Sequence, residues 1–285
     1  MKKLKELVEA CRFKVIHGGK CPILEKVKND YKSNFGIVSK HSHQYRGTMN
    51  HQRGIEIADA YTNLEHSPDD FLVRTCYDKL GEEVIAQFKF LNQKEKIIYE
   101  PFEGKGEPYK NSFEMLKDFH NSHLYFFKTE AGFGEENSSL QNKMLEKTGF
   151  LCGDYELMVN DIFRIIHDIF GHAMNGYGFG AIGEDQAWFT HMQMFTPLAA
   201  AALTTETRGQ NCWVNFGSHM RNNLGEINQK DDPGFLFPQD RPFAEQKMGL
   251  LSPHISGIEV WELNHQAYAR FIDNWAPLRT LSDNF

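Results

Sequence analysis

The stretch Asn160-Asp-Ile-Phe-Arg-Ile-Ile-His-Asp-Ile-Phe-Gly-His172 is the most informative part of the sequence for the fold. Its apolar residues recur at the spacing of an amphipathic helix: Ile162, Phe163, Ile166, Ile169 and Phe170. Asn160 or Asp161 can cap the start of this helix, and Gly171 is typical of the residue that follows a helix end. The stretch therefore predicts a buried helix that ends near Phe170.

His167 and His172 are the residues of this stretch that can bind a metal. On an ideal helix, two residues five apart point about 140° away from each other. Both imidazoles can then reach one ion only if the helix ends between them, and Gly171 is expected to provide that end. The spacing differs from the four-residue spacing of the zinc proteases, which needs no break.

Two further helices are expected after this stretch. The helix predicted over residues 184–195 places Glu184 and His191 on one face, where they are expected to hydrogen-bond to the ligating histidines and orient them. The helix predicted over residues 197–209 carries Glu206 on a face of small apolar residues. A buried carboxylate is unfavourable unless it is paired or bound to a cation. We therefore predict Glu206 as the carboxylate ligand, with Glu184 as its competitor.

The segment His167-Asp-Ile-Phe-Gly-His172 resembles the His-Glu-x-x-Gly-His motif of the pterin-dependent aromatic amino acid hydroxylases. The resemblance covers about forty residues and implies a mononuclear non-haem iron held by His167, His172 and Glu206. It departs from the family pattern in having Asp168 in place of Glu and a shorter gap to the acid. The longer stretch from residue 184 to residue 215 is also similar to uncharacterised bacterial and phage proteins.

Two neutral histidines and one carboxylate leave coordination positions open for dioxygen and a small-molecule substrate. We therefore expect an O2-dependent hydroxylase or oxygenase that uses Fe(II), with Zn or Mn as the other metals that suit the site; the organic co-substrate is not identified. Arg208 is expected to bind a substrate carboxylate or phosphate, and Asp168 is a second catalytic candidate. Aromatic side chains are expected to keep the substrate pocket dry: Phe163, Trp188 and Trp213.

Two alternatives stay open. The adjacent His167 and Asp168 are similar to the ligand pair of HD-type metal phosphohydrolases and dinuclear oxygenases. His191 could join such a site, and the further ligands would come from distant residues: His120 or His123, and Asp231. The other alternative is a non-catalytic protein, for example a virion component, in which the cluster binds a structural metal.

Composition excludes several classes of protein. The chain has 285 residues, a net charge of −7 and an isoelectric point near 6.0, which argues against general nucleic-acid binding. The longest apolar run, residues 197–203, is too short to span a membrane. Residues 1–10 predict an amphipathic helix and not a signal peptide. The five cysteines form no CxxC pair, which favours reduced thiols and a cytoplasmic location.

The pattern of elements predicts a mainly α fold with a small β element. We expect one domain over residues 1–285, with an N-terminal helical and β half to about residue 150 and the metal site in residues 151–285. A helix should begin at Ser67-Pro68, and residues 131–150 should form a loop. Strands are predicted at 96–101 and 123–128, and helices at 243–251 and 257–274.

Overall fold

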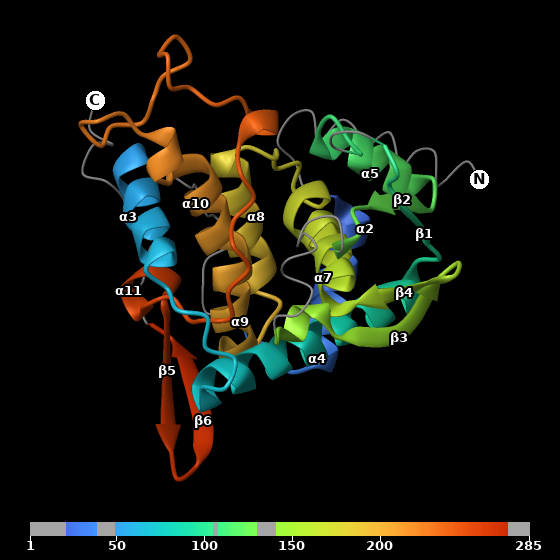
Figure 1. The fold of residues 1–285 in the computed structure, drawn as a ribbon. Helices are drawn as coiled ribbons and strands as arrows, with labels where there is room; N and C mark the ends of the chain where they lie inside the picture. The colour runs from blue at the N-terminus through green and yellow to red at the C-terminus, as the bar shows by residue number, and fades with distance from the viewer. Residues whose placement is uncertain (1–20, 39–48, 105–107, 130–140, 273–285) are drawn as a thin grey trace.

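The computed structural model describes residues 21–38, 49–104, 108–129 and 141–272. These ranges form a mainly α structure with small sheets at its periphery, as the sequence predicts (Figure 1). The helix predicted over residues 1–10 lies outside the described residues. In the described ranges, none of the helices is both long enough and apolar enough to cross a membrane.

The elements fall into helices, short helical turns and paired strands. The helices are α2 (Pro22–Asn34), α3 (His51–Thr62), α4 (Phe71–Lys94), α5 (Ser112–His120), α7 (Val159–His167), α8 (Ala181–Met192), α9 (Pro197–Thr204), α10 (Gln210–Phe216) and α11 (Pro253–Ser256). Two π-helical turns, η3 (Asp168–Ala173) and η4 (Thr205–Gly209), continue α7 and α9. Three short 3-10 turns are η2 (Lys143–Leu145), η5 (Ser218–Met220) and η6 (Pro238–Asp240).

The helix α4 runs through the main core and packs along α7 and α9. It begins at Phe71 and not at Ser67, because the Asp70 side chain caps it by accepting a hydrogen bond from the Val73 N–H. Its buried side chains meet those of α7 and α8 in one apolar cluster, which contains residues from both halves of the chain, among them Leu80, Val84, Ile162, Ile166 and Trp188. Burial of such side chains is the main favourable contribution to folding.

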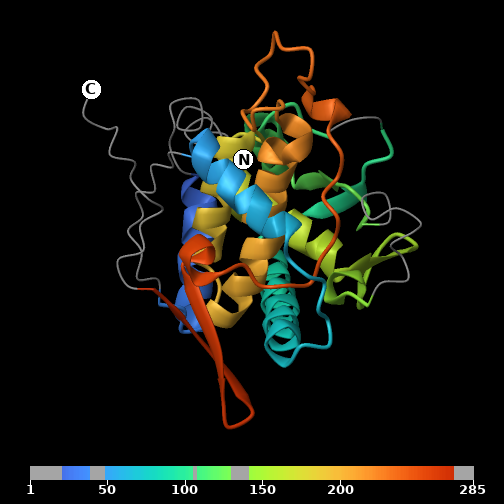
Figure 2. The same cartoon turned by 60° about the vertical axis from the view of Figure 1, so that its left-hand side comes forward.

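The strands form three separate two-stranded sheets. The strands β1 (Ile98–Pro101) and β2 (His123–Phe126) pair in parallel, which confirms both predicted strands. A hairpin of β3 (Lys147–Cys152) and β4 (Tyr155–Met158) leads into α7. The sequence pattern predicts no strands here, but a loop to residue 150 followed by the start of a helix. The other hairpin, β5 (Ile258–Leu263) and β6 (Gln266–Phe271), projects away from the helices (Figures 1 and 2).

The β5–β6 hairpin corrects the helix predicted over residues 257–274. Its two-residue turn consists of Asn264 and His265, both with positive φ, which is the type I′ turn that matches the twist of a hairpin. Cross-strand pairs then stabilise it, including Trp261 stacked on Tyr268 with ring centroids 6.0 Å apart.

The helix predicted over residues 243–251 is also wrong. Residues 242–252 have no regular structure and run past the helical body as an extended segment (Figure 1). Side chains of the helices bind its carbonyl groups: Tyr61 donates to Glu245 O, and Thr205 donates to Gly249 O. These bonds satisfy backbone groups that a helix would have satisfied internally.

Candidate metal centre

The helix that carries the two histidines does not end at Gly171. Its regular α-helical part, α7, stops at His167, and the chain continues without a break as the π-helical turn η3. In this turn the Met174 N–H donates to Ile169 O at 2.9 Å. A π-helix has i→i+5 hydrogen bonds, so residues five apart return to the same side. The rings of His167 and His172 accordingly lie together, with centroids 5.2 Å apart. The predicted helix break is therefore wrong, and the π-turn brings the two imidazoles together instead.

Gly171 has a packing role in this turn. A Cβ atom at this position would lie 3.1 Å from the Cβ of Ala187 and 3.3 Å from its carbonyl oxygen. Real Cβ atoms rarely approach so closely, so a larger residue here would require η3 and α8 to move apart by a few tenths of an ångström. Because α8 carries Glu184 in its first turn, this close approach brings the carboxylate to the histidines.

Three donor atoms converge between η3 and α8. The Oε2 atom of Glu184 lies 3.2 Å from His172 Nε2 and 3.9 Å from His167 Nε2. Within the described ranges, these three side chains form the group that could hold a metal ion, with their donor atoms within 4.8 Å of one another. Both histidines are buried, and the side chain of Glu184 is 28% exposed. Glu184 thus joins the donor group and does not merely orient the histidines.

Glu206, the predicted ligand, lies elsewhere. It is buried on η4, where Tyr77 donates to its Oε1 at 2.6 Å and Gln210 donates to its Oε2 at 2.7 Å. Burial raises the pKa of Glu206 to about 7, although both hydrogen bonds and the charge of Arg164 oppose the shift. The unfavourable burial of a carboxylate is met here by a raised pKa and by neutral hydrogen-bond partners. Glu206 therefore lies outside the donor group, and the carboxylate that the structure places beside the two histidines is that of Glu184.

A hydrogen-bond relay fixes the proton positions on two histidines. The carbonyl of Met194 accepts from Gln87 Nε2 at 3.2 Å, so Gln87 presents its oxygen to His191 Nε2 at 3.0 Å. His191 therefore carries its proton on Nε2 and offers the lone pair of Nδ1 to His167 Nδ1, 3.1 Å away. His167 must donate from Nδ1. Its Nε2 then has a lone pair that faces the donor group.

This Nε2 atom of His167 is buried and has no hydrogen-bond partner among the described residues. His172 is oriented in the same way, because its Nδ1–H donates to Tyr177 O at 3.2 Å and leaves Nε2 toward Glu184. Metal-binding histidines usually donate their other N–H to a protein acceptor in this manner. Two imidazole nitrogens and one carboxylate oxygen thus lie within 4.8 Å of one another, with both Nε2 atoms on the side of the carboxylate.

The electrostatics of the group favour positive charge at its centre. Burial lowers the pKa of His167, and burial together with the other two imidazoles lowers that of His191 well below its ordinary value. Burial opposes charge on His172 as well, but the Glu184 carboxylate outweighs it and raises the pKa of His172 to about 9. The two histidines in turn overcome the effect of burial on Glu184 and lower its pKa to about 2. A proton on His172 Nε2 and a metal cation therefore compete for one position.

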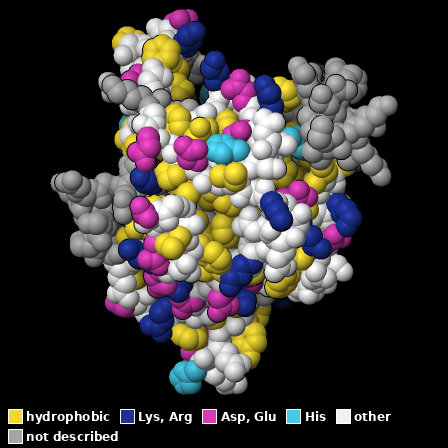
Figure 3. All heavy atoms as spheres, turned by 90° about the vertical axis from the view of Figure 1, so that its right-hand side faces the viewer, with side chains coloured by type: hydrophobic (Ala, Val, Ile, Leu, Met, Phe, Trp, Pro, Cys, Tyr) yellow, Lys and Arg dark blue, Asp and Glu magenta, His cyan; other side chains and the backbone are white. Residues whose placement is uncertain are grey.

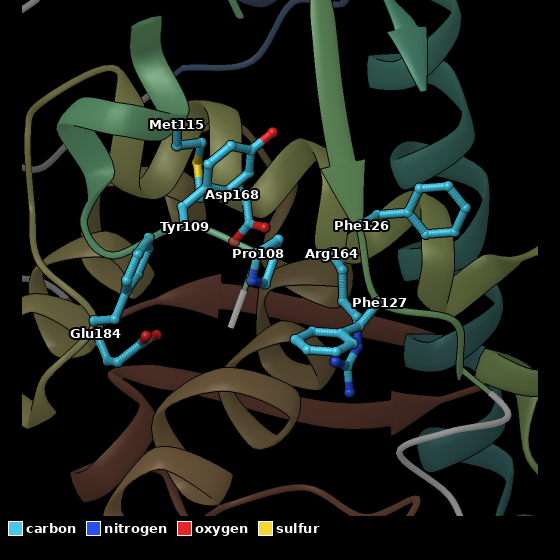
Figure 4. A pocket seen from close by; sticks show the side chains of 9 residues that line it. Pro108, Tyr109, Met115, Phe126, Phe127, Arg164, Asp168 and Glu184 are labelled. Atoms are coloured by element: carbon cyan, nitrogen blue, oxygen red, sulfur yellow. The ribbon is translucent and has the colours of Figure 1, made fainter. Parts of the chain in front are cut away.

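A pocket of about 180 Å³ adjoins the donor group (Figure 4). Its polar lining side chains are Glu184, Asp168 and Arg164. The remaining lining residues are apolar or aromatic: Pro108, Tyr109, Met115, Phe126, Phe127 and Phe179. The ring of Phe179 also contacts the ring of His172, with centroids 5.0 Å apart. The pocket and the donor group therefore share a wall.

The other predicted site residues divide between the centre and the core. Asp168 lines the pocket, and Phe163 stacks on His167 with centroids 5.7 Å apart. Arg208 lies outside the pocket lining, where its Nε donates to Asp185 at 2.8 Å and its guanidinium covers the ring of Trp188. Trp213 packs on His219 and not on the pocket.

The distant ligands considered for an HD-type site do not join the centre. His123 bonds to Asp118, and His120 and Asp231 lie outside the donor group. Gln87 and Arg164 are site residues that sequence reasoning missed. Arg164 lies inside the stretch that predicts the site, and a charge one helical turn before Asp168 was the available signal. On the face drawn in Figure 3, acidic and basic side chains are interspersed.

Comparison with models of protein families, with curated proteins and with solved structures finds no match. The function is therefore inferred from the geometry of the centre.

Proposed function

We propose that this chain is a mononuclear metal enzyme, an O2-dependent hydroxylase or oxygenase whose Fe(II) is held by His167, His172 and Glu184. The observation that carries the proposal is the convergence of two oriented Nε2 atoms on the Oε2 atom of Glu184, beside a pocket. Two histidines and one carboxylate with open positions are the ligand set of non-haem iron oxygenases. The resemblance to the hydroxylase motif supports the same chemistry for the two histidines.

The number of donors argues against a purely structural metal. Structural zinc sites usually have four protein ligands, often cysteines, whereas catalytic sites keep a position open. The donor group in the described ranges has three members and no cysteine. The metal would supply binding and activation of dioxygen. The chain would hold the imidazoles in place through Gln87 and His191, and aromatic side chains would keep water from the pocket.

A cytoplasmic location belongs to the same proposal. The cysteines in the described ranges are free thiols, and three of them, Cys21, Cys76 and Cys212, are buried. Fe(II) and free thiols both suit a reducing compartment.

Loading with Fe(II) under anaerobic conditions tests the proposal. We expect about one iron per chain and a visible nitrosyl absorption on addition of nitric oxide, because open positions remain. His167→Ala, His172→Ala and Glu184→Ala should each lose most of the iron with unchanged far-UV circular dichroism. Glu206→Gln is the matched control and should keep it. If Glu184→Ala keeps its iron and Glu206→Gln loses it, the assignment of Glu184 as the carboxylate ligand is overturned.

One observation favours a second candidate, a metal phosphohydrolase. Asp168 follows His167 directly and lines the pocket, where it could act on a metal-bound water. Hydrolysis of a phosphodiester such as bis(4-nitrophenyl) phosphate with Mn²⁺, lost in Asp168→Asn, would favour this candidate over the oxygenase.

A further inference from the structure

The pocket beside the donor group contains one cationic side chain, that of Arg164. Arg164 belongs to α7, four residues before Asp168, and its side chain is half-buried among the aromatic lining (Figure 4). In the ranges that the structure describes, its guanidinium makes no hydrogen bond and no ion pair within 4.0 Å. It acts on Glu206 only through space, where its charge lowers the pKa of that carboxyl group.

Two of the other arginines in the described ranges form buried or partly buried ion pairs. Arg208 bonds to Asp185, and Arg221 bonds to Asp59. A guanidinium offers five donors in a planar fork that fits a carboxylate or a phosphate. The Arg164 nitrogens are not among the buried atoms that lack a partner, so the guanidinium is open to the pocket and can exchange water for an anion. The environment of Arg164 is therefore suited to an anion that enters the pocket.

We propose that Arg164 binds the anionic group of a small substrate whose apolar body lies against Phe126, Phe127 and Phe179. This inference rests on the proposed function, because it takes the pocket as the substrate cavity of the metal enzyme. With the anionic group at Arg164, the apolar end of the substrate lies near Glu184, which lines the same pocket. The apolar end is therefore the part of the substrate next to the donor group.

The size of the pocket limits the substrate. Its volume is about 180 Å³. Pockets for drug-sized ligands begin near 300 Å³. The substrate class is therefore a compound with one anionic group, carboxylate or phosphate, and an apolar body of about one ring. Both anions share the chemistry that the guanidinium recognises.

Calorimetric titration of the full-length chain tests this inference, both without added metal and after loading with Zn²⁺. The probes are benzoate, phenyl phosphate and the neutral isostere benzamide. We expect benzoate or phenyl phosphate to bind at least about tenfold more tightly than benzamide, since a hydrogen bond to a charged group contributes about 1.5–3 kcal/mol. The preferred anion identifies carboxylate or phosphate as the natural group.

Arg164→Met keeps the apolar stem and should weaken the anionic probe at least about tenfold. Arg164→Lys should retain part of the affinity because it keeps the charge but not the fork. Arg74→Met removes an exposed charge of α4 outside the pocket and should change nothing. Equal binding of benzoate and benzamide, or undiminished binding in Arg164→Met, would overturn the inference, as would the absence of binding by either anion.

The metal-free titration separates this inference from the proposed function. If the chain takes up no iron but still binds the anion through Arg164, the metal enzyme is refuted and the anion site is supported. Iron uptake without Arg164-dependent binding would refute the substrate class alone.

Discussion

His167 and His191 are joined ring to ring, with their Nδ1 atoms 3.1 Å apart in a buried site. Two imidazole nitrogens can share one hydrogen only if one ring donates and the other accepts. Gln87 on α4 determines which ring donates, because its side-chain oxygen accepts a hydrogen bond from His191 Nε2–H. A side chain eighty residues before His167 in the sequence therefore sets which nitrogen of that histidine is free to bind a metal.

Replacing Gln87 should weaken metal binding without removing a ligand. In Gln87→Leu, His191 loses the acceptor that fixes its tautomer, and His167 is no longer held with its Nε2 lone pair inward. We expect the affinity for Zn²⁺, measured by competition with a chromophoric chelator, to fall by about 10–100-fold. Asn92→Leu is the control on the same helix, because Asn92 bonds to Tyr99 away from the centre. Equal zinc affinities of the two variants would contradict the relay.

A methyl group at Gly171 should disturb the contact between η3 and α8. The added Cβ would meet the Cβ of Ala187 at 3.1 Å and the His167 ring at 3.2 Å. We expect Gly171→Ala to lower the free energy of unfolding by about 1–3 kcal/mol, measured by urea denaturation. Gly81→Ala on α4 is the control. Its nearest neighbour is the flexible end of Lys143, so we expect a gain of up to about 1 kcal/mol from helix propensity.

Glu206 should make the stability depend on pH in a defined direction. Its pKa is about 7 in the folded protein against an ordinary value of 4.5, so the folded state holds the proton more tightly. The free energy of unfolding should therefore fall as the pH rises from about 4.5 to 7, by the order of 3 kcal/mol from this group.

The variant Glu206→Gln isolates this contribution. Its amide mimics the protonated acid, because it can accept from Gln210 and donate to Tyr77, whose own hydroxyl can donate to Lys247 O. Urea denaturation across pH 5–8 should show the wild type losing stability relative to the variant as the pH rises. If the free energies of unfolding of the wild type and the variant differ by a constant amount from pH 5 to pH 8, Glu206 is not held as a neutral acid.

Asp161 should be one of the most sensitive positions of the scaffold. Its buried carboxylate accepts hydrogen bonds from both the backbone and the hydroxyl of Thr129, from the Tyr155 hydroxyl and from the backbone of Met158. Asp161→Ala leaves these donors without their acceptor, and we expect a loss of about 3–5 kcal/mol in the free energy of unfolding. Asp154→Ala, at an exposed position of the β3–β4 turn, should change it by less than about 0.5 kcal/mol.

Local sequence patterns predicted the parts of the fold that depend on local physics. The periodicity of α4 and the β-branched and aromatic runs of β1 and β2 were sufficient, because each pattern matches one backbone geometry. The final hairpin was missed because its turn, Asn264-His265, lacks the glycine that usually marks a type I′ turn. Without that signal, residues 257–274 were predicted as a helix.

The choice of carboxylate could not be made from the sequence alone. Both Glu184 and Glu206 have inward-facing positions, and both need compensation for burial. For Glu206, a hydrogen bond from Tyr77 provides part of this compensation. Tyr77 lies 129 positions away in the sequence, so no local pattern could reveal the contact. The two histidines were identified from the sequence, but the π-turn that unites them was not, since a glycine at that position is compatible with a helix end as well.

The π-helical turn lets the helix hold one more residue between the two histidines without redirecting the chain that follows. Deletion of one residue between His167 and His172 would leave the histidines four apart, the spacing that stacks side chains in an ordinary α-helix. The imidazole pair would survive such a deletion. The chain beyond it would leave the helix in nearly the same direction, because five residues of the π-turn close about the same turn as four residues of an α-helix. The extra residue is therefore a local bulge that the helix accommodates while Glu184 on α8 keeps its place beside the histidines.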